Sequence, residues 1–488
     1  MTKNPAIYEI NTRVWLKRFG DNVKIDEVPD EYWLSLKEKG IDLIWLMGIW
    51  KTKPELAKKY CYEEGLIREY SGALKDWKEE DVIGSPYAID EYEVNPELGD
   101  EDRLLKLKLK LNEFGMGLIL DFISNHFHAE SKTLREHPEI FLPANEHYYS
   151  EDQHTFYKPF KGNQIFAHGR DPFFPAWQDT VQINYFSTSA REYMIKMLIK
   201  LTRLCDGVRC DMAMLNLNNI FKNTWGGVLE NMGFKKPDIE FWNVAIEIIK
   251  DVRDDFILIA EAYWDLEYAL QKLGFDYTYD KKLTDRLTNS YPPEIRDHLL
   301  AEPDYQNKSV RFIENHDEER AFKTFGKNRE KAAATIISTL RGMRFYNDGQ
   351  FEGRRIKLPV QLGREPKETV VKCMVEFYDK LLEITKTKIF KEGEWRLLKT
   401  LPAWDRNESY QNILAWLWEY KDEKRLVVVN YSEWHSQCRI KLDVRGYAER
   451  VELIDLLSGN KYNHNIEDVT HSGAFIELKA FKSHIFEY

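Results

Sequence analysis

The chain has 488 residues, of which 43% are hydrophobic and 31% are charged, and its formal net charge is −11. This length exceeds one ordinary domain and suits an α/β barrel of about 250 to 400 residues with a smaller module beside it. No apolar stretch is long enough to predict a membrane span, and the basic residues are interleaved with acidic ones. We therefore expect no membrane and no nucleic-acid partner.

The five cysteines are odd in number and show no C-x-x-C spacing, so neither a disulfide framework nor a zinc site is predicted. The N-terminal sequence MTKNPAIYEINTRVWL lacks the basic and apolar segments of a secretory signal. These features predict reduced thiols and a cytoplasmic location.

Strand-like apolar runs alternate with helical patterns over most of the chain. In chain order they cover residues 7–15, 41–47, 118–122, 207–210, 257–260, 276–279, 310–313 and 343–346. Eight strands in βα alternation predict a (β/α)₈ TIM barrel.

Two helical patterns lie between the early strands. After Asp100, a possible cap, the leucines fit both strand-like alternation and helical spacing, and the βα topology favours a helix. Farther on, Ser189 and Glu192 have the spacing of a capping box. The apolar stripe that follows this box predicts a helix packed on the outside of the barrel, and it consists of Met194, Met197, Leu198 and Leu201.

Two segments interrupt or follow the βα rhythm. Residues 127–186 are too many for a plain loop after the third strand and predict a small insertion over the barrel mouth, lining a substrate cleft. After about residue 390, strand-like runs follow one another at 413–420, 426–430, 451–457, 475–478 and 484–488. We predict a barrel from 1–126 and 187–390, an insertion domain at 127–186 and a C-terminal antiparallel β-sandwich at 391–488.

Four of the barrel strands lead into polar residues that include a carboxylate. The segments are GLILDFISNH (117–126), DGVRCD (206–211), FILIAE (256–261) and VRFIENHD (310–317). Ligand chemistry in parallel sheets takes place where the strands end. The segments therefore predict one shared active site.

Arg209 and Asp211 are two residues apart on one strand, so their side chains point to the same face. A neighbouring guanidinium lowers the pKa of a carboxylate and holds it ionised, as a nucleophile requires. Glu261 follows an apolar run that would raise its pKa and let it donate a proton. Taken one at a time, these residues are more often structural than catalytic.

Further polar side chains are expected at the same barrel end. Asp317 with His316, and Asp121 with His126, would add a third carboxylate and further hydrogen-bonding groups. One alternative is a network that caps the strand ends, and another is a metal cluster of Asp121, His126 and His128.

Together, DFISNH, GVRCD, IAE and ENHD resemble the four ordered motifs of the α-amylase family of glycoside hydrolases. The resemblance implies a catalytic barrel with an insertion after strand three and a C-terminal β-sandwich. It also implies that Asp211 is the nucleophile, Glu261 the general acid/base and Asp317 the carboxylate that stabilises the transition state. Arg209 would orient Asp211, and both Arg209 and Asp121 would belong to the substrate-binding residues.

The resemblance extends to substrate contacts. His126 and His316 would contact the sugar whose bond is broken, and Tyr87 in SPYAIDEY matches the aromatic residue that stacks on it. A core tyrosine is the alternative for Tyr87.

The motifs depart from the family where it often binds calcium. Met212 to Leu215 stand where a Lys-His pair is common, and Gln182 stands where an Asp is common. Asn125 and Asp179 remain as candidate oxygen ligands, which is few for an ion that takes six to eight. We expect no cofactor and no metal site, with calcium as the alternative.

These observations predict a retaining hydrolase that cleaves α-glucosidic bonds in malto-oligosaccharides or related α-glucans. A transglycosylase or sugar phosphorylase of the same family would use the same intermediate. The alternatives of other classes are a non-catalytic carbohydrate-binding protein and a metal-dependent hydrolase.

Overall fold

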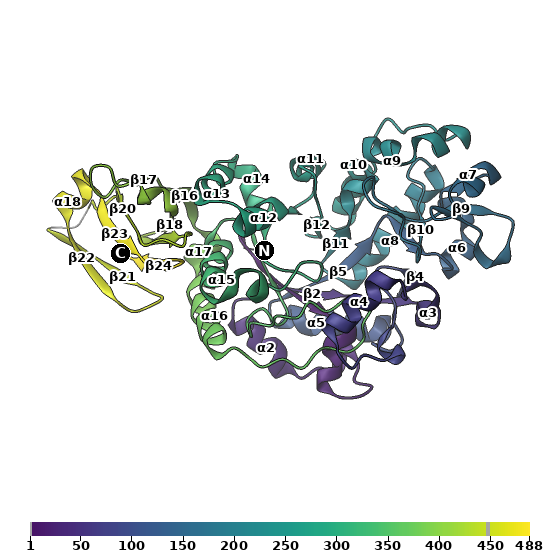
Figure 1. Ribbon diagram of the computed structural model, residues 1–488, viewed down its shortest axis with the longest axis horizontal. Coiled ribbons are helices and arrows are strands. Elements are labelled where there is room, and N and C mark those ends of the chain that lie inside the picture. Colours follow the sequence, from purple (N-terminus) through teal and green to yellow (C-terminus); the bar gives the residue numbers. More distant parts are fainter. Residues whose placement is uncertain (1, 446–448) are drawn as a thin grey trace.

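Eight parallel strands form a closed barrel in the computed structural model, which describes residues 2–445 and 449–488. The predicted fold class is confirmed, and the barrel occupies the middle of Figure 1. In order around the barrel the strands are β1 (Ala6–Asn11), β15 (Met343–Asn347), β14 (Ser309–Arg311), β13 (Tyr277–Tyr279), β12 (Ile257–Ala260), β11 (Gly207–Asp211), β5 (Gly117–Ile123) and β2 (Leu43–Met47).

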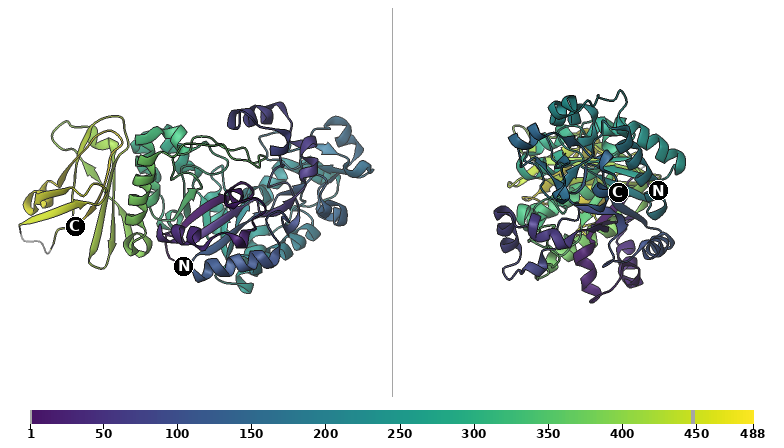
Figure 2. Two further views of the ribbon diagram at one scale, coloured as in Figure 1. Left: turned by 90° about the horizontal axis from the view of Figure 1, so that it is seen from below. Right: turned by 90° about the vertical axis from the view of Figure 1, so that its right-hand side faces the viewer.

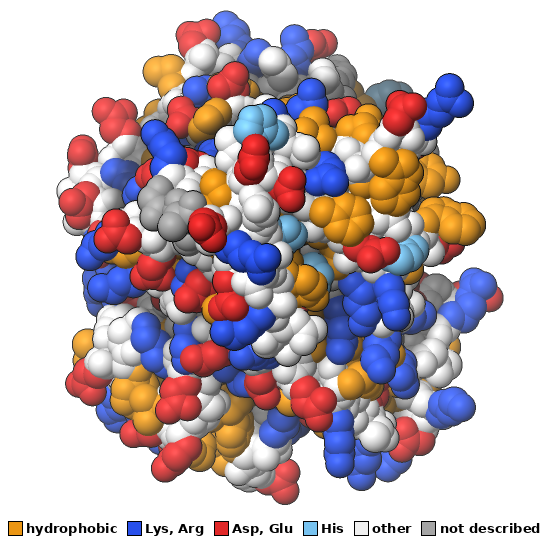
Figure 3. Space-filling model, turned by 90° about the vertical axis from the view of Figure 1, so that its left-hand side faces the viewer, with side chains coloured by type: hydrophobic (Ala, Val, Ile, Leu, Met, Phe, Trp, Pro, Cys, Tyr) orange, Lys and Arg blue, Asp and Glu red, His pale blue; other side chains and the backbone are white. Residues whose placement is uncertain are grey.

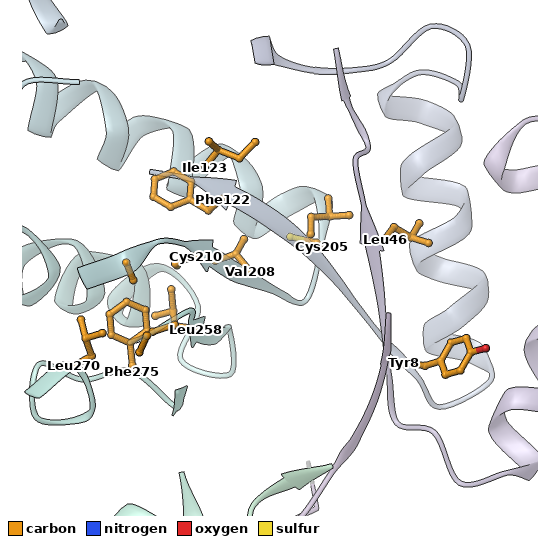
Figure 4. Packing of buried hydrophobic residues seen from close by; sticks show 14 of the residues in the cluster. Tyr8, Leu46, Phe122, Ile123, Cys205, Val208, Cys210, Leu258, Leu270 and Phe275 are labelled. Atoms are coloured by element: carbon orange, nitrogen blue, oxygen red, sulfur yellow. The ribbon is translucent and has the colours of Figure 1, made fainter. Parts of the chain in front are cut away.

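Alternate side chains of these strands point to two separate apolar layers. Inside the barrel, Trp45, Ile259 and Phe345 belong to one buried cluster. On the outside, residues such as Val208 and Leu258 pack beneath the helices, as Figure 4 shows. Because both faces of every strand are covered, the strands read as nearly continuous apolar runs.

The first barrel strand is shorter than predicted. The run 7–15 was expected to be one strand, but β1 ends at Asn11 and the chain turns into helix α1 (Thr12–Trp15). The apolar residues of α1 are buried as well. Burial on both elements explains why the hydrophobic pattern did not mark the boundary.

Helices cover the outside of the barrel. The larger ones are α2 (Asp30–Glu38), α5 (Glu101–Glu113), α8 (Thr188–Leu204), α9 (Asn218–Asn231), α10 (Phe241–Val252), α12 (Lys281–Asn289), α13 (Pro292–His298), α15 (Ala321–Thr339) and α16 (Lys372–Thr385). The predicted cap of α5 is confirmed, because the Asp100 carboxylate accepts a hydrogen bond from the Arg103 backbone N–H.

The start predicted for α8 is wrong. The helix has Ser187 as its N-cap residue and makes no side-chain capping bond, so Ser189 lies inside the first turn. The predicted stripe does face inward, with Met194, Leu198 and Leu201 buried and Met197 half-buried.

The segment between β5 and α8 forms a small structure of its own, which lies at the end of the molecule away from the C-terminus (Figure 1). Strand β6 (His126–His128) pairs antiparallel with β10 (Thr180–Gln182). A second small sheet and two short helices complete it, namely β7 (Pro143–Ala144), β8 (Phe156–Tyr157), β9 (Ile165–Ala167), α6 (Lys132–Glu136) and α7 (Glu146–Glu151).

The C-terminal part consists of two antiparallel sheets around a separate apolar core. One sheet has the order β16 (Glu394–Leu397), β18 (Ile413–Tyr420), β19 (Glu423–Asn430), β24 (Ser483–Glu487), β21 (Arg450–Asp455) and β22 (Lys461–Asn465). The other has the order β17 (Thr400–Leu401), β20 (Ser436–Ile440) and β23 (Ala474–Leu478). The left view of Figure 2 shows this unit at one end of the molecule, beside the barrel.

This unit is anchored to the barrel through buried side chains. The Trp418 indole N–H donates to the Thr339 carbonyl at the end of α15, at 2.7 Å. On the outer face of the unit, acidic and basic side chains are interspersed (Figure 3). None of the helices described in the structure has the length and apolar character that a bilayer crossing requires.

Candidate active site

Arg209 is the centre of a buried charge cluster inside the barrel. It lies on β11 beside Asp121 of β5, its register partner, and its guanidinium is 1% exposed. Nη1 lies 2.7 Å from Asp211 Oδ1 and 3.4 Å from Asp121 Oδ1, while Nη2 lies 2.8 Å from Glu261 Oε2. One guanidinium therefore forms ion pairs with three carboxylates, which are positioned by three adjacent strands.

Glu261 follows the last residue of β12, and its carboxylate accepts two hydrogen bonds in addition to its ion pair with Arg209. Besides Arg209, the Met212 backbone N–H donates to Oε2 at 2.6 Å. The Tyr263 hydroxyl donates to Oε1 at 2.8 Å. The side chain is 3% exposed.

Asp317 stands on the other side of the barrel mouth and is held through His316. The imidazole Nε2 lies 3.0 Å from Asp317 Oδ2, and Nδ1 lies 2.5 Å from Glu9 Oε1 of β1. The Asp317 carboxylate is 48% exposed, far more than Asp211 at 8%. It is therefore the most accessible of the three predicted acids.

Tyr87 bridges the two sides of the site. Its hydroxyl lies 2.8 Å from His316 Nε2, its ring stacks on the imidazole, and the Arg209 guanidinium lies 5.4 Å from the ring centroid. The ring is also part of the wall of a cavity.

The cavity has a volume of about 550 Å³ and holds the predicted catalytic acids in its wall. The barrel contributes Ser85, Tyr87, Asp211, Met212, Glu261, Tyr263, Asp317 and Gln361, and the small structure after β5 contributes His126, Asp171, Phe174, Trp177, Asp179 and Thr180. The segment 127–186 thus lines the cleft, as the sequence predicted.

Three of the five residues predicted to bind substrate lie outside this wall, namely Arg209, Asp121 and His316. Arg209 and Asp121, each 1% exposed, are buried beneath the cavity and are absent from its wall. Asp121 instead accepts hydrogen bonds from the indoles of Trp45 and Trp50, to Oδ2 and to its backbone carbonyl. His316 supports Tyr87 and Asp317 from behind.

Burial and charge crowding set the protonation of the cluster. Burial, reinforced by the charges of Asp211 and Asp317 against Arg209, raises the pKa of Glu261 to about 7. Burial also raises the pKa of Asp121 to about 7. Although burial disfavours its charge, His316 holds the pKa of Asp317 below its ordinary value.

Arg209 lowers the pKa of the Asp211 carboxyl, as predicted, but burial outweighs the guanidinium and the net pKa is raised. The pKa of Glu261 is raised, as predicted, and burial is the main cause, to which the charges of Asp211 and Asp317 add. Strand periodicity shows which residues share a face but not how deeply the face is buried.

The histidines and acids of the first motif do not form a ligand set. Asp121 faces Trp45, His126 contacts Trp177, and His128 Nδ1 accepts from the Glu130 backbone N–H. Over residues 2–445 and 449–488, no group of three His, Cys, Asp or Glu side chains is placed to hold a metal ion. The metal-cluster alternative is therefore not supported.

The residues at the implied calcium position do not fit the ion. Gln182 Nε2 donates to Asn125 Oδ1 at 2.9 Å, to the Asn125 carbonyl at 3.0 Å and to the Ile183 carbonyl at 3.0 Å. The Gln182 amide therefore already donates hydrogen bonds to the oxygens that would have to bind the cation. Calcium therefore has no part in the reaction that we propose below.

Several residues of the site escaped sequence analysis. Glu9 lies inside β1 without a motif around it, and Tyr263 and Trp177 lie in loops. For these three residues, the only indication in the sequence is that Tyr263 follows Glu261 by two positions. Met212 has φ 45° and ψ 44°, a left-handed conformation that the sequence MAML does not indicate.

A parallel barrel with paired carboxylates at its strand ends is the architecture of many glycoside hydrolases. The sequence profile of the α-amylase catalytic domain matches residues 31–355, more than half of the chain, so this protein belongs to the α-amylase family and is a glycoside hydrolase. A search of curated protein sequences finds no significant match.

Solved structures share the fold along the whole chain. A noncanonic maltogenic α-amylase from Thermotoga neapolitana is 22% identical with a TM-score of 0.71, covering 100% of this chain and 99% of that one. An α-amylase from Geobacillus thermoleovorans, complexed with acarbose, is 17% identical with a TM-score of 0.67 and coverage of 100% and 98%. An acarbose-soaked debranching enzyme from Nostoc punctiforme is 14% identical with a TM-score of 0.65 and the same coverage. At these identities the likeness shows the fold alone.

Proposed function

We propose that this enzyme hydrolyses α-glucosidic bonds in malto-oligosaccharides or related α-glucans with retention of anomeric configuration. Asp211 attacks the anomeric carbon, and Glu261 protonates the leaving oxygen and then activates water. Asp317 stabilises the transition state by binding sugar hydroxyls.

The observation that carries this proposal is the sharing of Arg209. Asp211 and Glu261 contact the two terminal nitrogens of one guanidinium, at 2.7 and 2.8 Å, and both line the same cavity. A planar guanidinium is small, so it holds the two carboxylates close together. A short separation is typical of retaining enzymes, whereas inverting enzymes leave room for a water molecule between the two groups.

The protonation of Glu261 suits its proposed role, and the contact with Arg209 suits that of Asp211. With its pKa raised to about 7, Glu261 can carry a proton near neutrality and release it to a leaving group. The Arg209 contact turns Asp211 Oδ1 toward a fixed cation and so restricts its rotation.

The substrate class rests on the cavity and on the family. A volume of about 550 Å³ with Tyr87, Trp177 and Phe174 in its wall suits sugar rings, which stack on aromatic faces and bind carboxylates through their hydroxyls. One of the similar solved structures is complexed with acarbose and another was soaked with it, which is consistent with an oligosaccharide substrate.

The test is early-time NMR of the product formed from maltotriose and other defined α-glucosides. Retention predicts that the α anomer appears first and then mutarotates, while β product would exclude double displacement. Repeating the assay with a sugar acceptor or inorganic phosphate distinguishes hydrolysis from transfer. A glycosyl product in place of free sugar would assign the enzyme to transfer or phosphorolysis.

A further inference from the structure

The two oxygens of the Glu261 carboxylate have different partners. Oε2 lies 2.6 Å from the Met212 backbone N–H and 2.8 Å from Arg209 Nη2. Oε1 lies 2.8 Å from the Tyr263 hydroxyl. Both groups on Oε2 carry nitrogen-bound hydrogens that can only donate, whereas a hydroxyl can donate or accept.

This difference decides where a proton can reside. A proton on Oε2 would face two donor groups and no acceptor, and it would cost the hydrogen bond from Met212 and the ion pair with Arg209. A proton on Oε1 requires only that the Tyr263 hydroxyl turns and accepts in place of donating. The neutral carboxyl of Glu261 therefore carries its proton on Oε1.

The backbone on the Oε2 side is fixed. Met212 is held in the left-handed region, which is strained for a non-glycine residue and persists only where the surroundings impose it. The next residue, Ala213, donates its N–H to the Glu261 carbonyl at 3.2 Å. The donors to Oε2 therefore cannot easily move away when Glu261 changes its protonation.

Tyr263, unlike the groups beside Oε2, can change its hydrogen bond when Glu261 changes its protonation. Its ring is half-buried in the cavity wall. Burial, followed by the charges of Glu261 and Asp317, raises the pKa of its phenol well above the ordinary value, so the hydroxyl keeps its hydrogen throughout the working pH range. The other titratable groups that face this part of the cluster are Arg209, Asp211, Tyr279 and Asp317.

We propose that Tyr263 is a positioning residue that directs the proton of Glu261 to Oε1 and stabilises the carboxylate after the proton has left. The inference rests on the proposed acid/base role of Glu261. It adds that Oε1 is the oxygen that carries the proton and that Tyr263 is the neighbour whose hydroxyl reorients.

Each half-reaction then moves one proton through Oε1. In the first, the Oε1 proton passes to the glycosidic oxygen as its bond to the anomeric carbon breaks and the Asp211 carboxylate bonds to that carbon. The Tyr263 hydroxyl then donates to the Oε1 anion. In the second, water gives a proton to Oε1, its oxygen bonds to the anomeric carbon, the bond to Asp211 breaks, and the hydroxyl turns back to accept.

The test is the pH dependence of kcat/KM in Tyr263→Phe, which keeps the ring and removes the hydroxyl. The anion of Glu261 loses a charge-assisted hydrogen bond while the neutral form loses a weaker one, so the pKa of Glu261 rises. The alkaline limb of the profile should move upward by roughly one pH unit. Tyr346→Phe is the matched control, because its hydroxyl donates to Ser338 Oγ on the outer side of β15 at 2.8 Å.

A uniform loss of rate without movement of the alkaline limb would overturn the inference and make Tyr263 a purely structural contact. Movement of the limb in both tyrosine variants would overturn it as well, because the shift would then not depend on the contact with Glu261. A limb that moves in Tyr263→Phe alone supports it.

A separate experiment tests the role on which the inference rests. Glu261→Gln should form a glycosyl intermediate from an aryl α-glucoside with an acidic phenol and then stall, and azide should restore turnover and yield an α-glycosyl azide. If losses on aryl and natural substrates are equal and azide has no effect, the acid/base role itself fails. If azide rescues this variant and Tyr263→Phe has an unshifted limb, the positioning inference alone fails.

Discussion

The barrel contains two buried charge clusters that are built differently. Inside the mouth, Arg209 faces the three carboxylates of Asp121, Asp211 and Glu261. On the outer side of the strands, Asp280 contacts Arg311 of β14 and His298 of α13. Each cluster contains one arginine, and the side chains of both arginines are almost fully buried.

The two clusters differ in charge balance and in access. The outer one pairs a single carboxylate with a guanidinium, and burial lowers the pKa of His298 to about 4, so this imidazole is neutral. The inner one has more carboxylates than cations and opens on a cavity. Holding like charges together costs free energy, which is expected at a site of chemistry and not in a structural ion pair. Burial alone does not distinguish the two.

Replacing Asp211 by Asn should have the largest effect on activity. The change removes the proposed nucleophile but nearly preserves volume and hydrogen bonding, so we expect a loss of about a hundredfold or more in kcat with the fold intact. Steady-state kinetics and thermal unfolding measure both. A folded variant that keeps more than about a hundredth of the wild-type rate would contradict the nucleophile assignment.

Replacing Asp280 by Asn should affect stability and not chemistry. Asn can still cap α12, where Asp280 Oδ1 accepts from the Leu283 N–H, but the buried Arg311 loses its counter-charge. Breaking such a pair costs about 3 kcal/mol in the free energy of unfolding. Denaturant unfolding checks the loss, and kcat of the folded variant should stay near wild type. A large drop in kcat without destabilisation would mean that the outer cluster also serves the active site.

Sequence patterns predicted the inner cluster far better than the outer one. Arg209 and Asp211 alternate with Cys210 on a short strand, and the end of a strand fixes both their direction and their position. Asp280, Arg311 and His298 come from a cap, a strand and a helix. Nothing in their local sequences indicates that they meet.

The same reasoning explains which residues of the active site could not be predicted from the sequence. Asp211 and Glu261 could be placed because the strands before them are regular, whereas Tyr263 depends on the path of a loop. Glu9 became part of the site through contact with His316, 307 positions away in the chain. Periodicity carries information over a few residues, and such contacts are set by tertiary packing alone.

The smallest expected effect concerns pH and the inner cluster's excess of carboxylates. The pKa of Glu261 is raised from 4.5 to about 7 in the folded protein, so between these values the folded state binds more protons than the unfolded chain. The free energy of unfolding should therefore fall as pH rises through this interval.

Glu261→Gln removes the titrating group, so its stability relative to wild type should be higher at pH 8 than at pH 5, by about 2 kcal/mol. Denaturant unfolding of both proteins at the two pH values measures the difference, with Glu247→Gln at an exposed position on α10 as the matched control. Equal relative stabilities at pH 5 and pH 8 would mean that Glu261 is charged throughout, and that Arg209 neutralises the crowded carboxylates as completely as Arg311 neutralises Asp280.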